Sequence, residues 1–261
     1  MKDIKVLLVP DVHGRSFWKE SVKDTLENYP DARVVFLGDY LDPYNDELEE
    51  VSPMEAFVMF SEDIIPLKNK YGDRVTLLLG NHDLGYWDLN ICDCRHDRYR
   101  DRDIYALLKN NYTLFRLADE ETIAGKHFVF SHAGIKEEYA NSCFEEVNEK
   151  NVVDLFNNAY LDCNYGIMDS LRTYSKYRGW GGPDYGSLVW SDLQEWMKGS
   201  KALPSAYGYQ IFGHTRLIEK RTGKPFVTAY FAMLDCRSTF YLDSNGVLRR
   251  WRDDEEMAVE F

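Results

Sequence analysis

The chain has 261 residues, a length that suits one large domain, and 44% of them are hydrophobic, enough to build a core. Its formal net charge of −13 argues against a surface for nucleic acid or anionic membrane, because both select basic patches. Five irregularly spaced cysteines indicate a reduced compartment, and no apolar run approaches the roughly 18 residues of a membrane span. We therefore expect a single cytoplasmic domain over residues 1–261, with neither nucleic acid nor membrane as a partner.

The first half of the chain alternates strand and helix patterns. Strands separated by helices of this length indicate βαβ units and a parallel sheet that is covered on both faces. One helix is predicted to begin with a capping box, in which Ser52 is the N-cap, Pro53 the first helical residue and Glu55 the third residue after the cap. The other predicted elements are strands at 4–9, 33–38 and 74–81 and a helix at 15–29.

The pattern loosens after residue 84. Residues 85–110 are predicted to be an insertion or cap near the site, and within them the charged run at 93–103 is typical of a solvated loop or the start of a helix. Residues 137–175 are predicted to be mainly helical. Further strands are predicted at 126–134 and 209–215, followed by antiparallel strands at 226–233, 238–243 and 247–251.

Polar residues follow the carboxyl ends of five predicted strands, and four of the six histidines are among them. Ligands of open α/β sheets bind outside these strand ends, so we expect the side chains to converge. Each residue alone is explained by an ordinary turn. Five such ends together are not, so we predict a site made by Asp11, His13, Asp39, Asp42, Asn81, His82, His132 and His214.

Carboxylate, imidazole and amide ligands in one place suit divalent manganese, iron or zinc, and their number suits two ions. Asp39 is the natural bridging ligand, because it lies between two groups of ligands in chain order. Two such ions, roughly 3.5–4 Å apart, lower the pKa of a bound water and hold both oxygens of a displacement at phosphorus.

The motifs DVHG, GDYLD, GNHD, SHAG and GHT, in this order, resemble those of the calcineurin-like metallophosphoesterase superfamily, over residues 6 to about 240. The LVWSD motif at 188–192 resembles the phosphoprotein phosphatase branch and its bacterial relatives. The resemblance implies a two-sheet α/β sandwich with a dimetal site at the strand carboxyl ends. It also implies that Asp11 and His13 hold the first metal, that Asp39 bridges, and that Asn81, His132 and His214 hold the second.

The same resemblance implies a general acid. His82 is similar to the histidine that gives a proton to the leaving oxygen, and Asp42 to the carboxylate that orients this ring and raises its pKa. The implied reaction is direct attack on phosphorus by a hydroxide that bridges the two metals, without a phosphoenzyme. The alternative is that His82 is a structural histidine beside the ligands.

The chain differs from many superfamily members at one position and from protein phosphatases at another. Arg216 stands where many superfamily members have a second histidine, and this matches the phosphoprotein phosphatase and diadenosine-tetraphosphatase-like branch. Pro43 and Tyr44 stand where protein phosphatases have the Arg-Gly pair whose arginine grips phosphate, and proline cannot replace a guanidinium fork. Arg178 in a glycine-rich loop is a candidate substitute, as are four arginines of the insertion: Arg95, Arg98, Arg100 and Arg102.

The spacing in CDCRH (92–96) is too compact for a usual zinc site, so we predict a loop there. The leading functional hypothesis is a phosphomonoesterase similar to Ser/Thr phosphatases, acting on a phosphoprotein or a small phosphoester. The alternative is a nucleotide phosphoanhydride or phosphodiester hydrolase of the dinucleoside polyphosphatase kind. A non-catalytic scaffold is the remote third hypothesis, since all the expected ligands are present.

Overall fold

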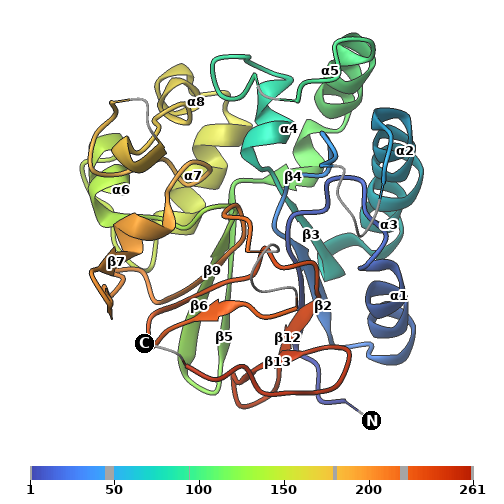
Figure 1. Ribbon diagram of the computed structural model, residues 1–261, viewed down its shortest axis with the longest axis vertical. Helices are drawn as coiled ribbons and strands as arrows, with labels where there is room; N and C mark the ends of the chain where they lie inside the picture. Colours follow the sequence, from blue (N-terminus) through green and yellow to red (C-terminus); the bar gives the residue numbers. More distant parts are fainter. Residues whose placement is uncertain (1, 45–49, 94, 179–180, 218–222, 260–261) are drawn as a thin grey trace.

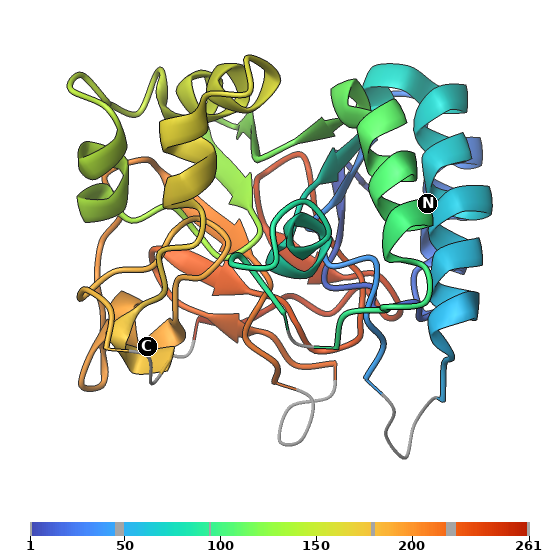
Figure 2. The same ribbon diagram turned by 90° about the horizontal axis from the view of Figure 1, so that it is seen from above.

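The computed structural model describes residues 2–44, 50–93, 95–178, 181–217 and 223–259, and it forms an α/β sandwich. Two sheets face each other in the middle of the molecule (Figure 1). Helices α1 to α3 cover one sheet and α6 to α8 cover the other, as the view from above also shows (Figure 2). The predicted two-sheet α/β fold is therefore confirmed.

The first sheet has the strand order β13-β12-β1-β2-β3-β4, and β1 to β4 run parallel. The second sheet has the order β10-β11-β9-β6-β5, in which β9 is parallel to both β6 and β11. The strands are β1 (Val6–Val9), β2 (Arg33–Phe36), β3 (Val75–Leu78), β4 (Phe115–Arg116), β5 (Ala118–Ile123), β6 (Lys126–Ser131), β7 (Met197–Lys198), β8 (Lys201–Ala202), β9 (Tyr209–Phe212), β10 (Phe226–Val227), β11 (Phe231–Met233), β12 (Phe240–Leu242) and β13 (Leu248–Arg250).

The helices are short, and none within the described residues is long and apolar enough to cross a bilayer. The α-helices are α1 (Lys19–Asn28), α2 (Pro53–Val58), α3 (Ile65–Tyr71), α4 (Asn81–Gly85), α5 (Asp101–Asn110), α6 (Glu137–Cys143), α7 (Val152–Leu161) and α8 (Tyr165–Ser170). A π-helical segment, η1 (Met59–Ile64), joins α2 to α3, and 3₁₀ turns are η2 (Gly72–Arg74), η3 (Tyr112–Leu114), η4 (Lys176–Arg178) and η5 (Leu193–Trp196).

Strand β1 is a continuous run of apolar residues, and the structure shows why. Its side chains alternate between two cores, with Leu7 and Val9 packed toward the helices and Val6 and Leu8 packed between the sheets. All four are buried, because a sheet covered on both faces has no wet side. This arrangement holds the central strands rigidly and presents their carboxyl ends at one edge.

The predicted capping box at the start of α2 is present. The Ser52 side chain accepts from the Glu55 N–H at 3.2 Å, and the Glu55 carboxylate accepts from the Ser52 N–H at 2.7 Å. The cap fixes where the helix begins after the loop that follows the second strand.

The C-terminal strands differ from the prediction in one place. Residues 226–233 form a hairpin of β10 and β11 instead of one strand, because Thr228 Oγ1 accepts from the N–H groups of Tyr230 and Phe231 and turns the chain. The predicted antiparallel pairing is confirmed for β12 with β13 and for β10 with β11, but β11 also runs parallel to β9. Strand β5 was not predicted, because the consecutive polar residues in its middle interrupt an apolar pattern.

Candidate metal centre

The site residues leave the sheets where the central strands end. Asp11 and His13 follow β1, Asp39 follows β2, and Asn81 follows β3 as the first residue of α4. From the second sheet, His132 follows β6 and His214 follows β9. The structure thus brings together all six residues predicted as metal ligands; their individual roles stay predictions.

Two histidines point at the same oxygen of Asp39. His13 Nε2 lies 3.5 Å and His132 Nε2 3.4 Å from Asp39 Oδ2. The Nδ1 of His13 is 2.8 Å from the Leu41 carbonyl oxygen, and the Nδ1 of His132 is 2.9 Å from the Leu37 carbonyl oxygen. A carbonyl can only accept, so each Nδ1 carries a proton, and in the neutral ring Nε2 is left as the nitrogen with a lone pair on the side of Asp39.

The second group of donors is closely packed around His132. Its Nε2 lies 2.9 Å from Asn81 Oδ1 and 3.1 Å from His214 Nδ1. On the other side of the site, both carboxylate oxygens of Asp11 accept from the His214 backbone N–H, at 2.9 and 3.0 Å. The ligand atoms of Asp39, His132 and His214 lie within 4.8 Å of one another, as do those of His13, Asp39 and His82.

These donors fit divalent cations. The buried His214 Nε2 has no hydrogen-bond partner within the described residues, and the Nε2 atoms of His13 and His132 converge on one carboxylate oxygen of Asp39. Mixed imidazole, carboxylate and amide oxygen is a donor set for borderline divalent metals. Asp39 belongs to both groups of ligand atoms, which is the position of a bridging carboxylate.

The electrostatics of the site also call for positive charge. Burial, with repulsion from Asp39, raises the pKa of Asp11 to about 6, although His132 acts in the opposite direction. Burial likewise raises the pKa of Asp235, which faces both carboxylates. Burial lowers the pKa of His132, but the neighbouring Asp39 outweighs this and raises it to about 9. Three carboxylates in one buried place repel one another, and cations would relieve that repulsion.

The backbone at the site is held in an unusual conformation. His13, Asp39, Asp42 and His214 have φ angles of 45°, 54°, 57° and 67°, which side-chain-bearing residues rarely adopt. Such strain persists only where the surroundings impose it, and it concentrates at functional sites. Asp83 imposes part of it, because its carboxylate accepts from the N–H groups of Gly80, Asp39 and Tyr40 at 2.9, 2.8 and 3.0 Å.

Two glycines allow the strand ends to approach this closely. A Cβ on Gly80 would lie 2.1 Å from Asp39 Oδ1, and a Cβ on Gly213 would lie 1.9 Å from Asp11 Oδ2. Both distances are far below van der Waals contact. The "GN" and "GH" pairs of the sequence therefore have a steric reason as well as a chemical one.

His82 and Asp42, the predicted acid and its partner, are also brought together. His82 Nδ1 lies 2.9 Å from Asp42 Oδ2, and the His82 backbone N–H donates to Asp39 Oδ1 at 3.0 Å. Burial raises the pKa of Asp42, although the neighbouring His82 acts in the opposite direction. The Tyr86 hydroxyl donates to Asp42 Oδ1 at 2.6 Å and accepts from the Asp97 N–H at 2.9 Å. Sequence reasoning missed Tyr86, which ties the inserted segment to this pair.

A cavity of about 210 Å³ opens over the ligands. Arg178 lines it, as predicted, with its Nε 3.0 Å from Asp192 Oδ2 and its Nη2 donating to Thr215 Oγ1 at 3.0 Å. Six further lining residues were not predicted to contribute to the site from the sequence: Arg15, Tyr44, Trp190, Arg216, Asp235 and Arg237. The available signals were that Arg15 and Arg216 directly follow the DVHG and GHT motifs and that Trp190 lies within LVWSD.

The arginines of the insertion separate into two groups. Arg95 stacks on Tyr44, with its Cζ 3.9 Å from the ring centroid. None of the four insertion arginines lines the cavity, although Arg95 reaches the ring of Tyr44, which does; Arg100 pairs with Asp97 at 2.8 Å. In the segment 92–96, His96 stacks on the Tyr86 ring at 4.2 Å, and Cys94 lies outside the described residues.

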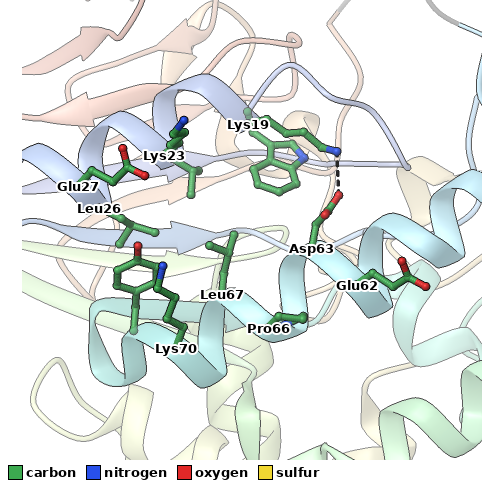
Figure 3. Close-up of a pocket in the computed structure, with 12 residues that line it drawn as sticks. Lys19, Lys23, Leu26, Glu27, Glu62, Asp63, Pro66, Leu67 and Lys70 are labelled. Carbon is green, nitrogen blue, oxygen red and sulfur yellow. Dashed lines mark ion pairs between the residues drawn. The ribbon is translucent and has the colours of Figure 1, made fainter.

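A larger hollow of about 320 Å³ lies elsewhere, between α1 and the helices η1 and α3 (Figure 3). Its charged side chains are lysines and carboxylates, and Lys19 pairs with Asp63 across it at 2.7 Å. None of the predicted site residues lines it. Its size therefore does not make it the chemical site.

The model of the calcineurin-like phosphoesterase family matches residues 4–215. The chain belongs to this family. The resemblance found in the motifs is therefore confirmed.

Among curated proteins, the Ser/Thr-protein phosphatase PP1-delta of Caenorhabditis elegans is 21% identical over 216 residues, covering 80% of this chain. The match spans only 56% of the length of that protein. Among solved structures, the cold-active protein-tyrosine phosphatase of a psychrophilic Shewanella species has a TM-score of 0.54 at 15% identity, covering 99% of this chain and 83% of that one. A mutant of a cold-active protein tyrosine phosphatase has a TM-score of 0.56 at 14% identity and the same coverage. These structures show the shared fold.

Proposed function

We propose that the protein is a dimetal phosphomonoesterase similar to Ser/Thr phosphatases, with manganese, iron or zinc as the metals and a phosphoprotein or small phosphoester as the substrate. The observation that carries this proposal is the position of Asp39, whose carboxylate belongs to two groups of ligand atoms. Asp11 and His13 would complete one metal position, and Asn81, His132 and His214 the other. Two ions held there would supply an activated water and neutralise the charge of the phosphoryl group.

The residues of the chain divide the remaining work. The Nδ1 of His82 is engaged by Asp42, so Nε2, 3.3 Å from the hydroxyl of the cavity-lining Tyr44, is the nitrogen that can deliver a proton to a leaving oxygen. Asp42 keeps the ring in that orientation, and Tyr86 holds Asp42 by its second oxygen. Arg178, anchored by Asp192 and Thr215, is placed to bind phosphoryl oxygens with its remaining donors.

A phosphoanhydride hydrolase acting on nucleotides is the second candidate. The observation that favours it is the composition of the cavity wall, where Arg15, Arg178, Arg216 and Arg237 all line a space of about 210 Å³. Guanidinium groups are the preferred ligands of phosphate chains. Pro43, in the position after Asp42, supports the same reading, because it withholds the arginine that protein phosphatases use there.

The test is the metal content of the purified protein together with a panel of substrates. Elemental analysis should find close to two divalent metal ions per chain, or the protein should take them up from added Mn²⁺. The panel comprises p-nitrophenyl phosphate, its bis ester, a phosphopeptide and a dinucleoside polyphosphate. Protein that neither contains nor binds metal would refute the proposal, and faster turnover of the dinucleoside polyphosphate than of any monoester would favour the second candidate.

A further inference from the structure

Strand β11 brings one more carboxylate to the edge of the second sheet from which two predicted metal ligands arise. β11 runs parallel to β9, and Met233 lies opposite Phe212 in the register of the two strands. Asp235 follows Met233 at the level at which His214 follows Phe212, two residues beyond the paired position. Its side chain lines the same cavity as His214. Because the carboxyl ends of parallel strands meet at one edge, Asp235 belongs to the metal centre by its place in the fold.

Within the described residues, nothing holds the Asp235 carboxylate: no hydrogen bond or ion pair joins it to a side chain or to the backbone. Its backbone is fixed, because its carbonyl oxygen accepts from the Leu217 N–H at 2.8 Å. Other carboxylates of the centre are held. Asp11 accepts from the His214 N–H, and Asp83 accepts from three backbone N–H groups. The oxygens of Asp235 are therefore available to a group in the cavity.

The surroundings make this carboxylate costly unless positive charge lies near it. Burial raises the pKa of Asp235 well above its usual range, and repulsion from Asp11 and Asp39 adds to the rise, although Arg15 acts in the opposite direction. An ionised carboxylate that has neither a hydrogen bond nor an opposite charge is destabilising in such a place. A cation in the centre, or a hydrogen-bond donor polarised by that cation, would compensate this cost.

Asp235 lies on the side of the first metal position. In the second sheet, β9 lies between β11 and β6, so the residues that follow β11 and β6 are on opposite sides of His214. His132 follows β6 and holds the second metal under the proposed function, on which this inference rests. Asp235, on the other side, therefore faces the position assigned to Asp11 and His13. Among the charged neighbours of Asp235, Asp11 contributes most to the rise of its pKa.

The first metal position has fewer protein donors than the second. Asp11, His13 and the shared Asp39 serve it, and Arg216 stands where a further histidine would be. Water would complete the coordination there, and the O–H groups of a water beside a cation are strong donors. Asp39 Oδ2 lies 3.5 Å from His13 Nε2, whereas no ion pair within the described residues joins Asp235 to that ring. Asp235 is thus set back from the ligand atoms, as a carboxylate that acts through water would be.

We propose that Asp235 is a positioning residue of the first metal position: its carboxylate accepts hydrogen bonds from the water that completes this position, and it thereby raises the affinity of the protein for its first metal ion. Groups that orient the ligands of a metal commonly contribute to its affinity in this way. The role differs from that of Asp39, which contacts both groups of donors itself.

Binding of Mn²⁺ to the metal-free protein, followed by electron paramagnetic resonance of the free ion, tests the proposal without using activity. The wild-type protein should bind two ions. Asp235→Asn keeps the size of the side chain and removes its charge, so the affinity for one ion should fall by about 10–100-fold, while that for the other stays within about twofold. An asparagine oxygen can still accept from water, so Asp235→Ala is included and should weaken binding at least as much. Asp31→Asn, at an exposed position, is the matched control and should change neither affinity.

Thermal unfolding distinguishes a positioning role from support of the fold. In the metal-free protein, Asp235→Asn should leave the melting temperature unchanged or raise it, because the described residues give this carboxylate no hydrogen bond to lose and repulsion from Asp11 and Asp39 is relieved. With Mn²⁺ added, the rise in melting temperature should be smaller in this variant than in the wild type, because weaker binding stabilises the folded state less.

Wild-type affinity for both ions in Asp235→Asn and in Asp235→Ala would overturn the positioning role. A lower melting temperature of metal-free Asp235→Asn would show that the carboxylate supports the fold, and it would overturn that role as well. A wild-type protein that binds no Mn²⁺ would overturn the proposed function and the positioning role with it. The failure of the inference and the failure of the proposed function are therefore distinguishable.

Discussion

The metal centre and the loops around Tyr44 are built in different ways. The metal centre is made at the ends of central strands, where strand pairing and burial on both faces fix the direction of each side chain. The surroundings of Tyr44 are made by loops: Arg15 donates to its carbonyl oxygen, and Arg95 and Arg216 lie over its ring. The difference is one between positions that the sheets fix and positions that depend on loop conformation.

The strongest test of this division is Asp39→Asn. The change removes the charge that both groups of ligand atoms share, so metal binding and turnover of every substrate should fall together, by about 10³-fold or more in kcat/KM. Elemental analysis and p-nitrophenyl phosphate hydrolysis measure the two effects. Asp31→Asn, at an exposed position before β2, is the matched control and should change neither. An Asp39→Asn protein that kept its metals would contradict the central role of this carboxylate.

Gly80→Ala attacks the same centre through its backbone. A methyl group 2.1 Å from Asp39 Oδ1 must displace that carboxylate, so metal affinity should fall by about 10–100-fold, as when groups that orient ligands are disturbed. Titration with Mn²⁺, followed by activity, measures this. Gly166→Ala, in α8, is the control for loss of a glycine, because the nearest atom to a Cβ at that position is Asn164 Oδ1 at an ordinary contact distance of 3.5 Å. Equal metal affinity in both variants would show that the strand ends have more room than the structure gives them.

His82→Ala should separate proton donation to the leaving group from metal binding. The metals should remain, but kcat for alkyl phosphates should fall by about 10²–10⁴-fold, the usual contribution of a general acid, while activated aryl phosphates slow far less. The measurement is the dependence of kcat on the pKa of the leaving group. Equal slowing of both classes would count against a general acid and favour a structural histidine.

Tyr86→Phe should give the smallest effect of this series. It removes the hydroxyl that donates to Asp42 Oδ1 at 2.6 Å, so the orientation of the Asp42–His82 pair would loosen without loss of either group. We expect kcat for poor leaving groups to fall about tenfold or less, with metal content unchanged. The same leaving-group series provides the readout. If activated and poor leaving groups slow alike in this variant, Tyr86 only supports the fold.

These two regions also differ in how much of each could be predicted from the sequence alone. The metal centre was predictable because β-strand patterns fix where strands end, and Asp39, Asn81 and His132 directly follow such ends. The pairing of His82 with Asp42 came from the resemblance and agrees with the 2.9 Å contact. Their chemical roles stay predictions until the variants are measured.

The contacts around Tyr44 could not be predicted from the sequence, for physical reasons. Arg95 was one of four arginines in the insertion, and nothing in a charged loop sequence shows which side chain folds back onto Tyr44. The sequence marked Tyr44 only as the neighbour of Pro43, although its hydroxyl lies within hydrogen-bonding distance of His82 Nε2. Loop conformations depend on contacts between segments far apart in the chain, and periodicity carries no information about those contacts.

The carboxylate of Asp83 has a wider consequence. By holding the N–H groups of Gly80, Asp39 and Tyr40 at once, it joins the loops after two different strands into a single block. A mutation inside that block would disturb several backbone hydrogen bonds at once. An exchange at Arg95 or Arg216 changes only a side chain on a loop. Proteins built in this way can acquire new substrates by changing surface loops while the reaction centre stays as it is.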